Sequence, residues 1–142
     1  DLIVSRGLGD VYKRQHERRC DYETLLRITI KHDKGERTIS GTLIAGNKPR
    51  IINIQGIAIE SDFPKNALYL RNYDKPGFIG DLGNTLGKKN INIASFHLGR
   101  RNVGGEAIAL VEVDGEVDEK IISQLRSLPQ VARVNIINFE NN

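Results

Sequence analysis

The fold is decided by residues 71–100, whose sequence is RNYDKPGFIGDLGNTLGKKNINIASFHLGR. A strand is expected to end at Asn72, because the turn-forming sequence Asp-Lys-Pro-Gly occupies positions 74–77. Apolar residues then recur at a nearly helical spacing and predict a short helix: Phe78, Ile79, Leu82 and Leu86. A second strand is expected from about Asn92. The stretch therefore predicts a strand, a turn, a helix and a strand in that order.

The next segment of the chain repeats this pattern. The run EAIALVEVDG at 106–115 predicts a third strand, and Asp118 is a candidate N-cap for a second helix that Pro129 would stop. The run QVARVNIINF at 130–139 predicts the last strand. The order βαββαβ over 68–139 predicts an α+β, ferredoxin-like fold with both helices on one face of a four-stranded sheet.

The segment before this fold is expected to be a small antiparallel β segment. Leu26, Ile28 and Ile30 alternate with polar residues, and Gly35 marks the turn of a hairpin. The run RIINIQGIAIE at 50–60 is expected to be one strand, interrupted at Gly56 by a bulge or a tight bend. Residues 61–67 are expected to be a connector.

The chain is divided on this basis into three parts. Residues 1–20 are expected to be a disordered or artefactual leader and are left out of the fold. Residues 21–64 form the β-rich part, and residues 67–142 form the ferredoxin-like domain.

Composition excludes several classes of function. The 142 residues contain 21 basic and 18 acidic side chains, no Trp, and a single cysteine, Cys20. We therefore expect no nucleic-acid partner, no disulfide, no metal site and a reducing, cytoplasmic compartment. No run approaches the roughly 20 apolar residues of a membrane helix, so no membrane partner is expected. No glycine fingerprint for a nucleotide and no catalytic constellation is present, so this chain alone is expected to be no enzyme and to hold no cofactor.

The chemistry of the turn indicates a candidate receptor for an amino acid. Backbone N–H groups at the helix start, 77–80, can hold a carboxylate, and Asp74 can pair with an ammonium group. Asn92 offers an amide that donates and accepts. The alternative is an ordinary turn, since Asp and Pro-Gly favour turns.

Two pairs of basic residues are weaker candidates. Lys48 and Arg50 flank Pro49 and are a candidate anion site, with a pair of solvated loop cations as the alternative. Arg100 and Arg101 are expected to be solvated turn cations.

The same residues resemble a known family. DKPG at 74–77, Leu-Gly at 86–87 and NINIA at 90–94 are similar to the signature of an ACT domain. The longer runs GTLIAGNKPRIINIQGIAIE, NYDKPGFIGDLGNTLG and GGEAIALVEVDGEV resemble the C-terminal regulatory region of long-form D-3-phosphoglycerate dehydrogenase. The resemblance makes 21–64 part of an allosteric substrate-binding domain and 67–142 the ACT domain. The NAD-binding catalytic domains of that family are absent from this chain.

The resemblance also implies an effector and its contacts. It implies L-serine or a related amino acid, held between paired ACT domains of a homo-oligomer. Its contacts would be Asn72, Asp74 and Asn92, with the helix start at Gly77, Phe78, Ile79 and Gly80. Two alternatives stay open: the regulatory part of an L-serine dehydratase, and a stand-alone ACT-type amino-acid sensor.

Overall fold

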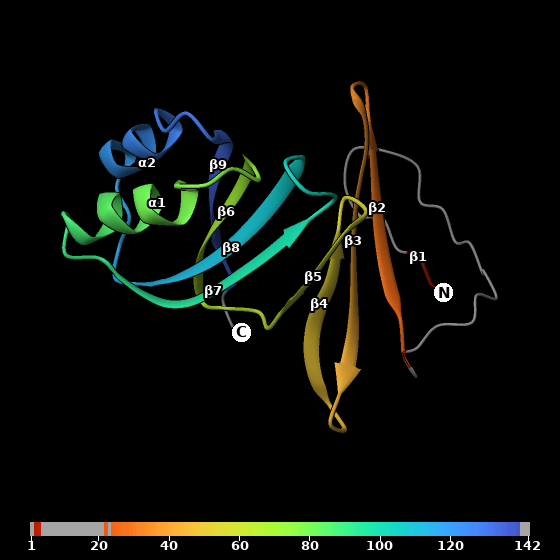
Figure 1. The fold of residues 1–142 in the computed structure, drawn as a ribbon. Coiled ribbons are helices and arrows are strands. Elements are labelled where there is room, and N and C mark those ends of the chain that lie inside the picture. Colours follow the sequence, from red (N-terminus) through yellow and green to blue (C-terminus); the bar gives the residue numbers. More distant parts are fainter. Residues whose placement is uncertain (1, 4–21, 23, 140–142) are drawn as a thin grey trace. The chain divides into compact units, whose positions relative to one another are not determined.

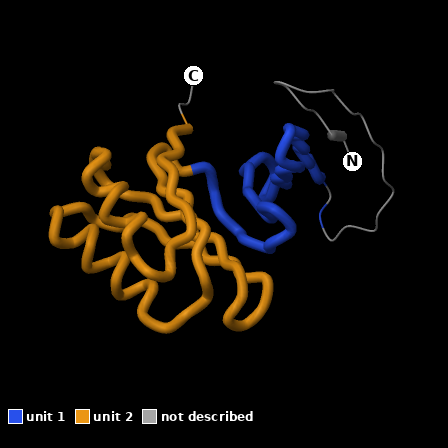
Figure 2. The backbone as a smooth tube through the Cα atoms, turned by 90° about the horizontal axis from the view of Figure 1, so that it is seen from above, with its two compact units in different colours: residues 1–63 blue, residues 64–142 orange. Residues whose placement is uncertain are grey.

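The computed structural model describes residues 2–3, 22 and 24–139. The chain divides into two compact units, Asp1–Phe63 and Pro64–Asn142 (Figure 2). The expectation of a disordered or artefactual leader falls mostly on 4–21, which lies outside the described residues, so it stays a prediction.

Unit 1 is built on a five-stranded sheet in the order β1-β2-β3-β4-β5 (Figure 1). The strands are β1 (Leu2–Ile3), β2 (Leu26–His32), β3 (Gly35–Ile44), β4 (Lys48–Ile54) and β5 (Ile57–Ser61). β1 pairs with β2 in parallel, and the other neighbours pair antiparallel. The expected β-rich segment and its first hairpin are confirmed.

The sequence around Gly56 departs from the single interrupted strand that we expected. β4 ends at Ile54, and β5 returns antiparallel to it from Ile57. Gln55 (φ 54°) and Gly56 (φ 79°) both adopt left-handed backbone, as a two-residue type I′ hairpin turn requires. Asn53 accepts a hydrogen bond from the Gly56 N–H at 2.9 Å, which fixes the turn. The glycine therefore reverses the chain rather than bending one strand.

Unit 2 has the expected βαββαβ order (Figure 1). Its elements are β6 (Asn66–Tyr73), α1 (Phe78–Gly87), β7 (Asn92–Arg100), β8 (Glu106–Asp114), α2 (Glu119–Arg126) and β9 (Val131–Asn138). The four strands form one antiparallel sheet in the order β7-β8-β6-β9, and both helices lie on the same face of it. β7 and β9 are therefore the edges of this sheet.

The core of unit 2 lies between this sheet face and the two helices. Leu68, Leu70, Leu82, Leu86 and Leu125 belong to it, and none is more than 1% exposed. Gly80, Gly83 and Gly87 weaken the intrinsic helicity of α1, so its buried face must hold the helix in place.

One prediction about the helix starts is confirmed, and another is wrong. The Asp118 side chain accepts a hydrogen bond from the Ile121 N–H at 2.9 Å, so the predicted N-cap of α2 is confirmed. Ile79 was expected on the apolar face of α1 but is 58% exposed. It follows Phe78, which is buried, and neighbouring residues of a helix point about 100° apart.

Across the residues that the structure describes, no helix is long and apolar enough to cross a membrane.

Candidate functional site

The candidate site lies at the end of unit 2 where β6 leads into α1. Asn72 is the next-to-last residue of β6, and Asp74 lies in the turn that follows this strand. Gly77 caps α1 with left-handed backbone (φ 93°) and provides no side-chain cap. A helix start without a side-chain cap leaves N–H groups of its first turn available to an anion.

The Asp74 carboxylate is bound to the end of β7 and to the loop that follows it. Its Oδ2 accepts hydrogen bonds from Arg100 Nη1 at 2.8 Å and from the Gly104 N–H at 3.2 Å. The Asp74 N–H in turn donates to the Gly105 carbonyl at 2.9 Å. The Arg100 hydrogen bond and then the Gly104 N–H lower the pKa of Asp74 below its ordinary value, so the carboxylate is charged at neutral pH.

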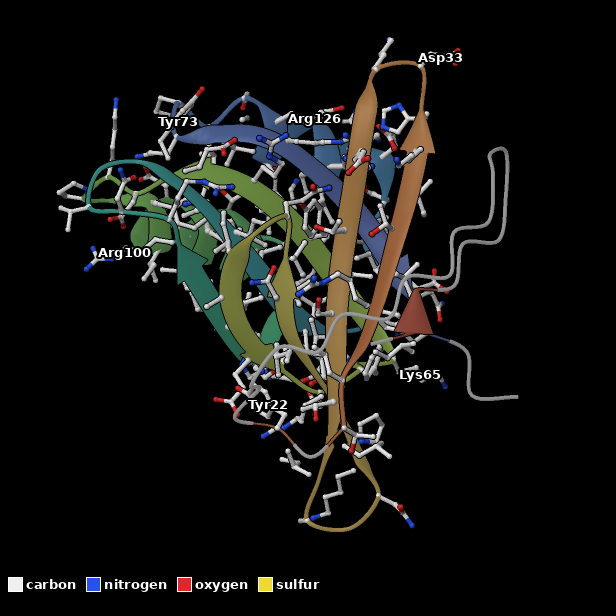
Figure 3. The ribbon with its side chains drawn as sticks, turned by 90° about the vertical axis from the view of Figure 1, so that its right-hand side faces the viewer. Tyr22, Asp33, Lys65, Tyr73, Arg100 and Arg126 are labelled. Atoms are coloured by element: carbon white, nitrogen blue, oxygen red, sulfur yellow. The ribbon has the colours of Figure 1, made fainter. Side chains whose placement is uncertain are left out.

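Arg100 is therefore more than the solvated turn cation that we expected. It forms an ion pair with Asp74, and Arg101 forms a different one with Glu106 at 3.8 Å. Figure 3 shows Arg100 and Tyr73 at the same end of unit 2, with Lys65 toward the other end. No local sequence pattern indicates the contact between Arg100 and Asp74, because 26 positions separate the two residues.

Two buried amides lie at the end of β6, where the Tyr73 N–H donates to the Gln130 carbonyl at 2.9 Å. The Asn72 residue is 2% exposed and its Nδ2 donates to the Tyr73 carbonyl at 3.2 Å. Gln130 is 9% exposed and its Nε2 donates to Asp81 Oδ2 at 3.0 Å. Among the described residues, neither amide oxygen has a hydrogen-bond partner. Sequence analysis missed Gln130, whose position next to Asn72 depends on the pairing of β6 with β9.

Asn92 lies at the opposite end of the sheet from this group. It is opposite Asp114 on β8 and donates a hydrogen bond to that carboxylate at 2.7 Å. Asn72 is opposite Ala107, seven residues earlier on β8. At about 3.3 Å per residue, the two asparagines are about 23 Å apart along the strand direction. A single chain thus brings together Asn72, Asp74 and the helix start, but not Asn92.

The three other predicted site positions contribute in different ways. The side chain of Phe78 is buried in the core, and its backbone N–H donates to the Lys75 carbonyl at 3.4 Å. The side chain of Ile79 is exposed, and no atom lies within 4 Å of a Cβ built on Gly80. The surface of the α1 start is therefore formed by backbone and one exposed aliphatic side chain.

Lys48 and Arg50 lie in unit 1, two positions apart on β4, and so share one face of that sheet. Arg50 lines a cavity of about 390 Å³ whose other walls are mainly apolar and include Thr42, Leu43 and Phe63. The structure thus places the two predicted anion-binding residues on one face of the unit 1 sheet.

No group of three or more side chains suited to metal binding occurs in the part of the chain that the structure describes.

Comparison with known proteins agrees with this architecture. Residues 66–130 match the profile of the ACT domain, and residues 2–55 match that of the D-3-phosphoglycerate dehydrogenase intervening domain. The second match begins inside the segment 1–20 that we had left out of the fold.

Several curated proteins are similar over most of the chain. D-3-phosphoglycerate dehydrogenase from Methanocaldococcus jannaschii is 36% identical over 119 residues, and the enzyme of that name from Bacillus subtilis is 31% identical over 118 residues. Each alignment covers 83% of this chain but 22% of the relative. A probable L-serine dehydratase beta chain from Bacillus subtilis is 32% identical over 111 residues, which is 78% of this chain and 50% of that protein.

Residues 66–130 thus belong to the ACT domains, and residues 2–55 belong to the D-3-phosphoglycerate dehydrogenase intervening domains. The chain is homologous to the regulatory regions of these dehydrogenases and spans about a fifth of their length.

Proposed function

We propose that this chain is the L-serine-binding regulatory portion of a D-3-phosphoglycerate dehydrogenase of L-serine biosynthesis. The observation that carries the proposal is the charged Asp74 carboxylate next to the uncapped start of α1. A carboxylate binds an ammonium group, and free N–H groups bind a carboxylate, so the two together fit the charges of an amino acid.

A second copy of the chain would complete this site. β7 is an edge strand that runs from Asn92 to Arg100, so its middle residue is Phe96. Two β7 strands paired antiparallel about a two-fold axis near Phe96 bring Asn92 of one copy beside Arg100 of the other. Asn92 then reaches the Asp74 end of the second copy. Pairing through β9 would not do this, so the proposed homodimer uses β7.

The proposed control of activity is a linkage between this dimer and catalytic domains outside the chain. L-serine bound between two ACT domains favours one subunit arrangement, and the catalytic domains respond to that arrangement. NAD would bind in those catalytic domains, and no step of its chemistry involves the residues described above. The cytoplasmic location and the role of Lys48 and Arg50 in binding an anion remain proposals of the same kind.

The second candidate function is regulation of an L-serine dehydratase. It is supported by the similarity to the probable dehydratase beta chain, of which this chain covers 50%. Both candidates use the same effector, and they differ in which catalytic protein is attached. The upstream reading frame distinguishes them: a nucleotide-binding fingerprint supports the dehydrogenase, and iron–sulfur cysteines support the dehydratase.

Calorimetric titration of the full chain with L-serine tests the binding proposal directly. We expect saturable binding of L-serine, much weaker binding of D-serine, and a dimer by sedimentation. Asp74→Ala should weaken L-serine binding by about ten- to a hundredfold, since a hydrogen bond to a charged group is worth about 1.5–3 kcal/mol. A well-folded dimer that does not bind L-serine would refute the proposal, as would equal affinity in the variant.

A further inference from the structure

We propose that Arg100 binds the carboxylate of the amino-acid effector, so that the Asp74–Arg100 ion pair recognises a zwitterion charge for charge. The inference rests on the proposed function and adds Arg100 as a second, charged partner of the effector carboxylate, in addition to the N–H groups at the start of α1.

Within the described part of the chain, the ion pair leaves free N–H donors on Arg100 and a free acceptor oxygen on Asp74. It joins Arg100 Nη1 to Asp74 Oδ2 at 2.8 Å, and the Gly104 N–H donates to the same oxygen. Within residues 24–139, no further hydrogen bond is made by Asp74 Oδ1 or by the other guanidinium N–H groups of Arg100. The Arg100 side chain is 53% exposed and that of Asp74 is 22% exposed, so a small ligand can reach both.

The position of Arg100 places it on the sheet face that carries Asn72. Ala107 of β8 is the register partner of Asn72 on β6 and also of Arg100 on β7. Residues directly opposite one another on neighbouring strands share a face of the sheet. The three positions therefore form a row across the sheet on the helix side, with only a methyl group between the amide and the guanidinium.

The two charges suit an α-amino acid better than they suit a simple anion or cation. The ammonium nitrogen and the carboxylate carbon of an amino acid are both attached to one carbon atom, so the charges lie side by side, as they do in the ion pair. Arginine presents a planar fork of N–H groups that matches a carboxylate. An anion without an ammonium group would be repelled by Asp74, and an amine without a carboxylate would be repelled by Arg100.

The test is to compare L-serine with L-serinamide, which keeps the ammonium and hydroxyl groups but lacks the carboxylate charge. Both are titrated calorimetrically into full-length wild type and Arg100→Gln. We expect Arg100→Gln to weaken L-serine binding by about tenfold or more, because a charged, fork-like contact is lost. Binding of L-serinamide should stay the same or become tighter, because the repulsion is removed.

Arg101→Gln is the matched control. Arg101 is the next residue, is similarly exposed, and forms an ion pair with Glu106. Its loss should leave the affinity for L-serine unchanged. Arg100→Lys keeps the charge without the planar fork, and we expect an affinity between those of wild type and Arg100→Gln.

The outcomes separate this inference from the proposed function. Equal L-serine affinity in wild type and Arg100→Gln overturns the role of Arg100, and so does an equal loss of affinity for both ligands. Tighter L-serine binding by Arg100→Gln would mean that Arg100 competes with the ligand for Asp74, which also overturns it. Failure of wild type to bind L-serine refutes the proposed function itself, and the assignment of Arg100 with it.

Discussion

Replacing Asn72 by leucine should stabilise unit 2 and weaken ligand binding at the same time. Asn72 follows Leu68 and Leu70 on the face of β6 that packs against the helices, and all three are nearly inaccessible to solvent. Its Oδ1 has no hydrogen-bond partner among the described residues. A leucine of similar shape would continue the apolar row and would remove the unpartnered oxygen.

The magnitude follows from the two contacts of the amide. A buried carbonyl oxygen without a partner costs about 1–3 kcal/mol, and the hydrogen bond from Nδ2 to the Tyr73 carbonyl contributes about 0.5–1.5 kcal/mol. The Tyr73 carbonyl keeps a donor after the substitution, because the Lys75 N–H also binds it at 2.8 Å. We therefore expect a net gain of about 1 kcal/mol in the free energy of unfolding, which corresponds to about 4–8 °C in Tm.

Urea denaturation followed by far-ultraviolet circular dichroism measures this change. Both helices of the described structure lie in unit 2, so the helical signal reports the unfolding of that unit. The control is Leu70→Asn, which puts the same amide two positions earlier on the same buried face. It should destabilise by about 3 kcal/mol or more, from lost apolar burial and a buried polar group. A loss of stability in Asn72→Leu would refute the reasoning, since it would mean that the Asn72 oxygen makes a favourable contact in the folded protein.

Three further predictions concern pH, capping and backbone conformation. The folded-state pKa of Asp74 is lowered from 3.8, so its contribution to stability is present above that value and is lost as the pH falls through the lower folded-state pKa. In acid unfolding monitored by circular dichroism, the stability difference between wild type and Asp74→Asn should vanish in this pH range. A difference that stays constant with pH would be inconsistent with the ion pair. Asp118→Ala should lower the free energy of unfolding in urea by about 1 kcal/mol, because the Ile121 N–H loses its acceptor. Asp118→Asn should keep most of the wild-type stability, because its amide oxygen can still accept this hydrogen bond. Gly77→Ala should destabilise the protein by about 1–2 kcal/mol, because the φ angle of Gly77 is 93°. Gly83→Ala lies inside α1, where a Cβ meets nothing within 4 Å, and should stabilise the protein. Equal effects of the two substitutions would contradict the conformational argument.

The elements of unit 2 could be predicted from the sequence because each carries a local signal. The apolar spacing in 78–86 marks α1, and Asp118 marks the start of α2 through a contact only three residues long. Strand order then follows from the handedness of the crossovers. These signals are local or depend on general rules of chain geometry, so they do not require knowledge of distant contacts.

The arrangement of the candidate site could be predicted only in part. The Asp74 turn and the α1 start are neighbours in sequence, and the structure keeps them together. The partners of Asp74 are Arg100 and Gly104, and the buried Gln130 directly precedes β9, so no local pattern indicates them. The distance of Asn92 from the others follows from the length of β7.

The contacts of Asp74 connect ligand binding to the proposed dimer. The carboxylate holds Gly104 and Arg100, and Arg100 is the last residue of the edge strand β7. A ligand ammonium that shares this carboxylate must change the strength of those two hydrogen bonds, and it therefore acts on the end of β7. If two β7 strands pair in the dimer, a ligand that orders this end favours pairing, and by reciprocity pairing favours the ligand. The affinity for L-serine should then rise with protein concentration over the range in which the dimer forms.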